Sequence, residues 1–341
     1  MSALQPMAPA EAVDLYLDAR ESELSEKSLQ NQRYRLRSFV EWCDSEEIDN
    51  LNDLTGRDLH RFRVWRSNGD GDRYDAVSTV TLRGILQTLR KFLEFAASID
   101  ACEQGLRERV LLPEVDAEDE SSDEKLPADH AQELLRYFDR FRYASRDHVI
   151  VALLWHTGIR LGSLRALDVS DFDPDGRFIR LRHRPGQETP LKNRRAAERK
   201  IAVGEHYAQV LSDYIEHHRH DVTDEYGREP LITSRHGRLT EVPIRQTLYR
   251  VTRPCVIGEC PHDKDPETCE WMVNNERASG CPSSRSPHGV RRGAITQHLR
   301  DGVPEEVVTD RMNVSADVLD QHYDQRSERE RMETRREFLP D

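Results

Sequence analysis

The sequence predicts two mainly α-helical domains, the second of which also carries a small antiparallel sheet. Three observations favour this fold class. Apolar residues recur at helical spacing through the first hundred residues, an acidic polar stretch follows Pro113, and two short alternating segments come later in the chain. A chain of 341 residues is long enough for two domains of about 100–200 residues each.

Four helices are expected in the first domain, residues 1–112. Their expected bounds are residues 11–20, 28–42, 57–65 and 78–97. Ser28 and Thr55 are suitable N-caps for the second and third helices. Tyr34, Leu36 and Phe39 are expected to supply apolar contacts of the second helix. The pattern therefore predicts an all-helical domain.

A polar segment separates this domain from the rest of the chain. Residues 113–127 include the run EVDAEDESSDEK, which cannot bury a core and is expected to form an exposed linker. The second domain is expected over residues 128–327, and residues 328–341 form a C-terminal helix or a solvated tail. Its expected elements are helices at 128–141, 146–155 and 205–217, and strands at 179–182 and 200–203 joined through a turn at 191–199.

Composition and charge limit the compartment and the partners. No apolar run is long enough to cross a bilayer and no signal-peptide pattern opens the chain, so we expect a cytoplasmic protein without a membrane partner. The formal net charge of −13 argues against a nucleic-acid ligand. Yet the basic residues are six lysines and forty-four arginines, and arginine suits bidentate phosphate contacts. This composition fits a salt-rich cytoplasm or a GC-rich genome, and it leaves DNA open as a partner.

Basic residues are interleaved with the expected helices of the first domain. They are candidates for DNA binding, although solvated helix faces are the simpler explanation. The candidates are Arg33, Arg35, Arg37, Arg61, Arg83, Arg90 and Lys91.

Five polar residues of the second domain are candidates for a functional site when they are considered together. His288 and Arg291 share one face of an expected helix that Ser286 caps. Each residue alone is explained more simply as a surface charge or a half-buried aromatic. In chain order the five are Arg160, Lys192, His288, Arg291 and Tyr323.

This order resembles that of the tyrosine recombinase family, which contains the phage integrases and the Xer-type site-specific recombinases. The run TGIRLGSL around Arg160 is similar to the family's TGxRxSEL, and HGVRR at residues 288–292 is similar to HxLRH. The resemblance covers nearly the whole chain. It implies a helical, SAM-like core-binding domain followed by a catalytic domain, with all five residues in catalytic roles.

Two positions depart from the family pattern. The acidic residue usual three positions after the first arginine is Ser163, and the LGH motif reads Met312-Asn313-Val314, so its usual His or Trp is absent. Both positions support the active site rather than carry the attack. They leave open a DNA-binding or regulatory protein that keeps the fold but has lost turnover.

The residue types suit the implied chemistry. A tyrosine hydroxyl attacking a DNA phosphodiester builds negative charge on oxygens that Arg160 and Arg291 can clamp. Lys192 can protonate the departing 5′ oxygen, and His288 can bind the phosphate or assist Tyr323. The 3′-phosphotyrosine link conserves bond energy, so rejoining needs neither ATP nor a catalytic metal.

The implied partners are double-stranded DNA and further copies of the chain, a dimer on each site and a tetramer in synapsis. A type IB topoisomerase-like enzyme is an alternative with the same chemistry.

The six cysteines fall into two sets. Cys43 and Cys102 are expected to be buried thiols. The other four lie in an insertion at residues 255–281, where a cytoplasmic quartet favours a structural zinc site over disulfides. Their spacing matches no standard finger, so free thiols or a redox staple are alternatives. The predicted ligands are Cys255, Cys260, Cys269 and Cys281, with His262 as a substitute for one of them.

Overall fold

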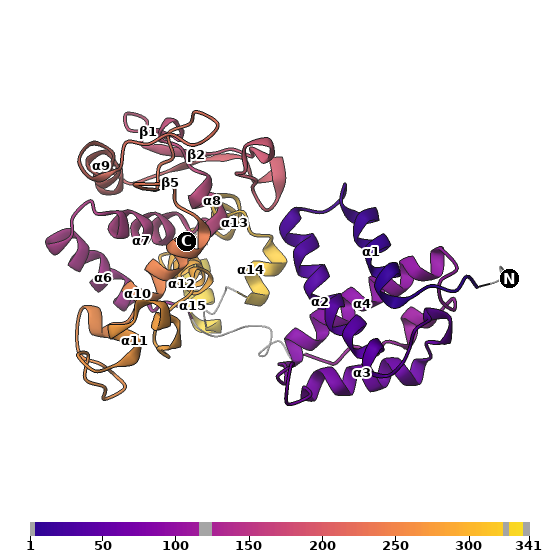
Figure 1. Ribbon diagram of the computed structural model, residues 1–341. Coiled ribbons are helices and arrows are strands. Elements are labelled where there is room, and N and C mark those ends of the chain that lie inside the picture. The colour runs from indigo at the N-terminus through magenta and orange to yellow at the C-terminus, as the bar shows by residue number, and fades with distance from the viewer. Residues whose placement is uncertain (1–3, 116–124, 323–326, 337–341) are drawn as a thin grey trace. The chain divides into compact units, whose positions relative to one another are not determined.

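The computed structural model describes residues 4–115, 125–322 and 327–336. It divides into an N-terminal unit, Met1–Ser122, and a C-terminal unit, Asp123–Asp341 (Figure 1). Both are mainly helical and the second contains small antiparallel sheets, so the predicted fold class is confirmed. Residues 116–124 of the predicted linker lie outside the described residues. None of the helices in the described ranges has the length and hydropathy needed to span a bilayer.

The N-terminal unit contains a helix at each of the four predicted positions. These are α1 (Pro9–Arg20), α2 (Glu26–Ser45), α3 (Gly56–Asn68) and α4 (Thr79–Ser98). Thr55 caps α3 as predicted, but α2 begins earlier than expected because Ser25, not Ser28, is its N-cap. The prediction for Tyr34 is wrong: it is 68% exposed, on the opposite face of α2 from the buried Phe39.

The C-terminal unit begins with three helices and a three-stranded sheet. They are α6 (Ala128–Phe141), α7 (Arg146–Thr157), α8 (Leu161–Ala166), β1 (Phe172–Asp173), β2 (Phe178–Leu181) and β3 (Arg199–Ala202). The remainder is α9 (Glu205–Asp213), β4 (Thr233–Ser234), β5 (Gly237–Arg238), α10 (Glu241–Val251), α11 (Glu270–Val273), α12 (Pro287–Arg300), α13 (Glu305–Met312), α14 (Ala316–His322) and α15 (Glu328–Arg336). The expected helix at 205–217 becomes α9 followed by a π-helical turn at 214–218.

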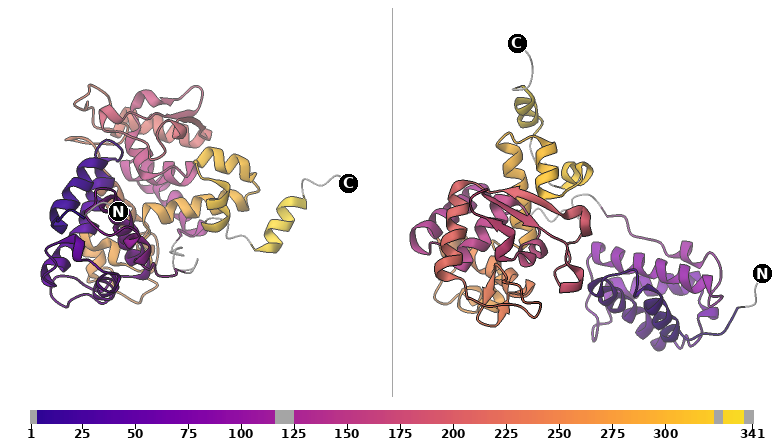
Figure 2. Two further views of the ribbon diagram at one scale, coloured as in Figure 1. Left: turned by 90° about the vertical axis from the view of Figure 1, so that its right-hand side faces the viewer. Right: turned by 90° about the horizontal axis from the view of Figure 1, so that it is seen from above.

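Helix α7 lies at the centre of this unit. Every residue from Asp147 to Trp155 is buried, and α6, α8, α9, α10 and α12 all contact the helix. The three-stranded sheet lies on one side of α7 and α11 lies on the other (Figures 1 and 2). Strand β2 pairs antiparallel with β1 and β3, with Ile179 opposite Ile201, and both isoleucines are buried. The sheet thus covers one side of the core and carries the β2–β3 loop.

Gly293 allows α12 to pack closely against the segment that precedes α6. A Cβ at this position would lie 2.3 Å from the Leu126 carbonyl oxygen and 2.8 Å from the Trp155 ring. We expect Gly293→Ala to lower the free energy of unfolding by about 2–4 kcal/mol, because main chain must move to relieve the overlap. Denaturant unfolding measures the loss. Gly186→Ala, where no atom lies within 4 Å, is the matched control, and equal stability of the two variants would contradict the prediction.

Candidate active site

Arg160 lies where α7 ends and α8 begins. Gly158 ends α7 in the left-handed region with φ of 59°, and a Cβ there would lie 2.6 Å from the Met312 sulfur. The turn places Arg160 in extended backbone at the N-cap of α8, where it is half-buried. Ser163, at the position where an acidic residue is usual, is buried in α8.

Lys192 lies on the loop between β2 and β3, as the sequence predicts. Leu191 is 3% exposed, whereas Lys192 and the following residues to Ala196 are exposed. Before them, Arg184 and Thr189 pair as an isolated antiparallel bridge. Lys192 therefore begins an exposed part of the loop, residues 192–196, that follows the buried Leu191 and precedes the buried Ala197.

Helix α12 carries the other two described candidates. The hydroxyl of Ser286 accepts a hydrogen bond from the Gly289 N–H at 3.1 Å, which confirms the predicted cap. His288 keeps solvent access, while Arg291 is 2% exposed. One Nη of Arg291 donates to the Gly158 carbonyl and the other donates to the Met312 carbonyl at 2.8 Å. Arg291 thus joins the turn before Arg160 to the end of α13.

The described candidates converge in space. The positive charges of Arg160, Lys192 and Arg291, with that of Arg292, all act on the His288 imidazole. Arg199 on β3 belongs to the same group: burial, then the guanidiniums of Arg291 and Arg160, lower its pKa to about 10. Sequence reasoning missed Arg199, since one strand arginine is a weak signal among forty-four. Such a concentration of positive charge suits a phosphate ligand.

These surroundings keep His288 neutral at pH 7. Desolvation by the surrounding protein and then the neighbouring cations lower its pKa to about 4. A neutral imidazole can accept a proton or a hydrogen bond. A phosphate among these cations would raise the pKa of His288 again, because opposite charge favours the protonated form.

Tyr323 lies outside the described residues. Helix α14 begins directly after Ser315 and ends at His322, so it leads to the tyrosine. Val314, where the family pattern has His or Trp, is 7% exposed and belongs to an apolar cluster with Leu299 and Val308. Its hydrocarbon side chain has no atom that could donate a hydrogen bond to a phosphate.

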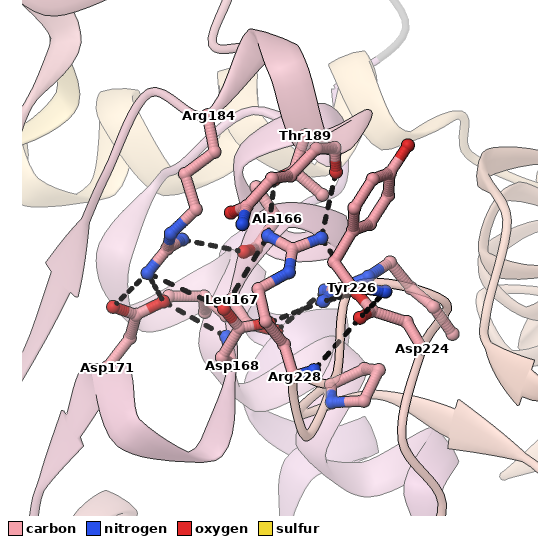
Figure 3. A network of polar contacts seen from close by, with 12 residues as sticks. Ala166, Leu167, Asp168, Asp171, Arg184, Thr189, Asp224, Tyr226 and Arg228 are labelled. Carbon is pink, nitrogen blue, oxygen red and sulfur yellow. Dashed lines mark hydrogen bonds and ion pairs between the residues drawn. The ribbon is translucent and has the colours of Figure 1, made fainter.

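A buried ionic network holds the base of the Lys192 loop (Figure 3). Asp168 contacts the guanidiniums of Arg184, Arg228 and Arg238, and Arg228 also donates to the Gln187 carbonyl at 2.8 Å and to the Thr189 hydroxyl at 2.9 Å. The network contains two more carboxylates: Asp171 pairs with Arg184, and Asp224 pairs with Arg228 and Arg238. Burial opposes the charge of Asp224, but hydrogen bonds from Arg238 and Arg228 outweigh it and lower its pKa to about 2. The loop therefore starts from a rigid base.

Two histidines on α7, His148 and His156, should make the protein less stable in mild acid. Burial lowers the pKa of His148 to about 4 and that of His156 to about 3. Each ring accepts a main-chain hydrogen bond, from Ala144 N–H and Gly204 N–H respectively, and protonation would break it. The unfolded chain binds these protons near pH 6.5, so the stabilisation is complete above that pH and is lost as the pH falls toward 4.

For His148, which is 1% exposed, the loss approaches about 3 kcal/mol. Thermal unfolding between pH 7.5 and 4.5 at constant ionic strength measures it. His148→Asn should flatten the pH dependence, whereas the same change at the exposed His218 should preserve it. A wild-type melting temperature that does not fall between pH 6.5 and 4.5 would rule the explanation out.

The cysteine-rich insertion packs beside α10. Its four thiols are free, and Cys255 lies within electrostatic range of Cys260 and Cys281. His262 shares a hydrogen bond of 2.9 Å with the Ser283 hydroxyl. Over the described ranges, no three His, Cys, Asp or Glu side chains are grouped so that they could hold a metal ion. The structure thus does not bring the predicted zinc ligands into one such group. Cys43 and Cys102 are buried, as predicted.

The predicted DNA-binding residues of the N-terminal unit differ in their surroundings. Arg35 donates to the Gly84 carbonyl at 3.1 Å and to the Thr88 hydroxyl at 3.2 Å, so it joins α2 to α4. Arg90 donates to the Val110 carbonyl at 2.9 Å. The remaining candidates, Arg33, Arg37, Arg61, Arg83 and Lys91, are exposed or half-buried. Contacts within the fold thus hold Arg35 and Arg90, and Arg37 and Arg61 form ion pairs with Glu41 and Glu46.

Comparison with known sequences identifies relatives of both units. The phage integrase family model matches residues 124–329, and the model of the phage integrase N-terminal SAM-like domain matches residues 14–99. Tyrosine recombinase XerC of Mycobacterium bovis is 28% identical over 181 residues, 53% of this chain and 49% of the relative. The match thus spans about half the length of that protein. Tyrosine recombinase XerD of Mycobacterium tuberculosis is 24% identical over 319 residues, 90% of each chain.

Solved structures share the fold. The Tn1549 transposon integrase in complex with a circular intermediate DNA superposes with a TM-score of 0.67 at 14% identity, over 97% of this chain and 99% of that one. A lambda integrase dimer bound to a COC′ core site superposes with a TM-score of 0.64 at 14% identity, over 95% of this chain and 79% of that one. Since the family model alone spans more than half of the residues, the chain belongs to the phage integrase family.

Proposed function

We propose that this protein is a tyrosine-type site-specific DNA recombinase that cleaves and rejoins strands through a 3′-phosphotyrosine intermediate. The observation that carries the proposal is that Arg160, Lys192 and Arg291, from three separate segments of an acidic protein, all act with their positive charge on the imidazole of His288. The XerC and XerD relatives and the integrase folds support it.

Each of the five residues receives a role that its chemistry allows. The Tyr323 oxygen bonds to phosphorus while the bond to the 5′ oxygen breaks. His288, neutral because its pKa is low, takes the phenolic proton, and Lys192 gives a proton to the leaving oxygen. Arg160 and Arg291 stabilise the charge on the non-bridging oxygens. The reverse reaction with another 5′ hydroxyl rejoins the strand, and neither direction needs a cofactor.

The assembly is proposed on the same basis. Residues 1–112 would bind duplex DNA as the core-binding domain, and residues 128–327 would carry the chemistry. We expect a dimer on each site and a tetramer when two sites pair, with the protein acting on DNA in the cytoplasm. Helix α15, whose Met332 is 46% exposed, is the candidate for contact with a neighbouring copy.

One observation favours a second function. Val314 stands where the family pattern has His or Trp, and Ser163 stands where it has an acidic residue, so a DNA-binding or regulatory protein without turnover is the alternative. A type IB topoisomerase-like activity is a third outcome, distinguished by relaxation of supercoils without preference for a site.

Covalent capture from a pool of duplexes tests these functions. Each duplex carries a randomised stretch and a nick, so that the cleaved strand diffuses away and the protein–DNA adduct accumulates. Sequencing the captured DNA should return one preferred site, and mapping the linked peptide should locate Tyr323. Two such sites in one plasmid should then recombine. Binding without capture would favour the regulatory protein, and capture without sequence preference the topoisomerase.

We also propose that Cys255, Cys260, Cys269 and Cys281 bind a structural zinc ion. All four thiols are free, and the buried guanidinium of Arg253 lies within electrostatic range of Cys255, Cys269 and Cys281, where it would offset the negative charge of thiolate ligands. Metal analysis of protein purified without chelators should find one zinc per chain, reduced by Cys269→Ser and unchanged by Cys102→Ser. Protein that contains no zinc would refute the site.

A further inference from the structure

The Lys192 loop and the end of α13 are joined directly by two asparagines. The Nδ2 of Asn193 donates to the Oδ1 of Asn313 at 2.6 Å, and the Nδ2 of Asn313 donates to the Ala196 carbonyl at 3.2 Å. The Ala196 oxygen can only accept, so Asn313 must turn its amide nitrogen toward it and its oxygen toward Asn193. Both contacts are satisfied by one orientation of the Asn313 amide.

A second set of hydrogen bonds ties the same two segments together. Arg199 Nε donates to the Arg311 carbonyl at 2.8 Å, and Arg311 in return donates to the Ala202 carbonyl at 2.8 Å. These contacts lie on β3, beyond the exposed part of the loop. They fix the end of α13 against the sheet, whereas the hydrogen bond from Asn193 connects it, among the described residues, to the residue that follows Lys192.

The backbone at Asn313 does not explain why an asparagine is there. Its φ is 51°, in the left-handed region, where it forms the C-cap of α13. Glycine adopts this conformation with less strain than asparagine and is the commoner residue at such a position. What asparagine adds is the amide that contacts Asn193 and Ala196. Asn313 also lies between α13 and α14, and in the sequence Tyr323 follows ten residues later.

We infer that the Asn193–Asn313 pair couples the loop that carries the general acid to the segment that carries the nucleophile, so that Lys192 and Tyr323 reach one phosphate together. Both asparagines are positioning residues. The inference rests on the proposed function. Its physical basis is that holding an exposed loop in one position costs conformational entropy, so the loop stays at the site only where specific contacts offset that cost.

Single-turnover covalent capture with two leaving groups tests the coupling. Asn313→Gly keeps the left-handed cap and removes the amide, and Asn193→Ala removes the donor. On the natural substrate we expect each change to slow capture about two- to tenfold, the value of one hydrogen bond. The double variant should be no slower than Asn313→Gly alone, because both changes remove the same contact.

The second substrate has sulfur in place of the bridging 5′ oxygen. The bond from Tyr323 to phosphorus then releases a 5′-thiolate, which needs no proton from Lys192. Both variants should therefore approach the wild-type rate on this substrate, with unchanged DNA affinity and melting temperature. Asn275→Ala, at an exposed asparagine of the same unit, is the control and should match wild type on both substrates.

Three results are decisive. Additive losses in the double variant, or equal losses on oxygen and sulfur substrates, would overturn the coupling, since a general disturbance of the site affects both leaving groups. Wild-type rates in Asn313→Gly would overturn it as well. If the wild-type protein captures neither substrate, the proposed function fails instead, and the two failures are thereby told apart.

Discussion

Tyr323→Phe is expected to abolish covalent capture of DNA, by at least about a thousandfold. Phenylalanine keeps the ring and loses only the oxygen that would bond to phosphorus. The site of Arg160, Lys192, His288 and Arg291 would still hold the phosphate, so binding should persist while the adduct disappears. Denaturing gel electrophoresis after incubation with the nicked substrate measures the adduct, and a mobility-shift assay measures the binding.

Tyr226→Phe is the matched control for this result. Tyr226 lies in the same unit, 38% exposed, and outside the cationic group, so its loss of a hydroxyl should leave capture unchanged. An adduct that survives in Tyr323→Phe would place the nucleophile on another residue. The order of residues that resembles the family would then have misidentified the tyrosine.

Asp168→Ala is expected to lower the free energy of unfolding by about 3–5 kcal/mol. Asp168 is 2% exposed, and its removal leaves Arg184, Arg228 and Arg238 with less negative charge in a buried place. Arg228 also holds Gln187 and Thr189, so the rate of capture should fall further than the folded fraction alone explains. Chemical denaturation and capture at low temperature measure the two effects.

Two comparisons sharpen this prediction. Asp221→Ala removes a carboxylate that is 93% exposed and lies 3.5 Å from Arg219, and it should cost less than about 1 kcal/mol. Replacing Arg238 by methionine in the Asp168→Ala background should recover part of the stability, because it removes one uncompensated guanidinium. A cost for Asp168→Ala as small as that for Asp221→Ala would mean that water replaces the lost carboxylate.

Local patterns predicted most of the helices. The apolar repeats of α4 and α7 are long enough that packing and propensity agree, and Ser286 and Thr55 cap their helices as expected. Predictions that required the direction of a side chain were weaker. Tyr34, for example, lies on the exposed face of α2 rather than in its apolar contacts. Strands of two residues, such as β4 and β5, have no detectable period.

Contacts between distant segments could not be predicted from local patterns. Asp168 meets Arg238 across seventy residues, and Asn193 meets Asn313 across 120. The sequence on either side of these residues gives no pattern from which the partner could be predicted. The order of Arg160, Lys192, His288 and Arg291 was found by resemblance to a family, and the structure shows them in one place. Arg199 was not predicted as a site residue because it is one of forty-four arginines and has no motif around it.

The hydrogen bonds from Arg291 to the Gly158 and Met312 carbonyls have a consequence for when the protein could become active. A protein that cuts DNA is dangerous when it is incompletely folded, because a broken strand could be released before it is resealed. Arg291 completes its bonds only when the end of α7, helix α12 and the end of α13 have all docked. An immature or partly denatured copy lacks that junction, and with it the arrangement that we propose for cleavage. The proposed cleavage activity would thus arise only in the fully folded protein.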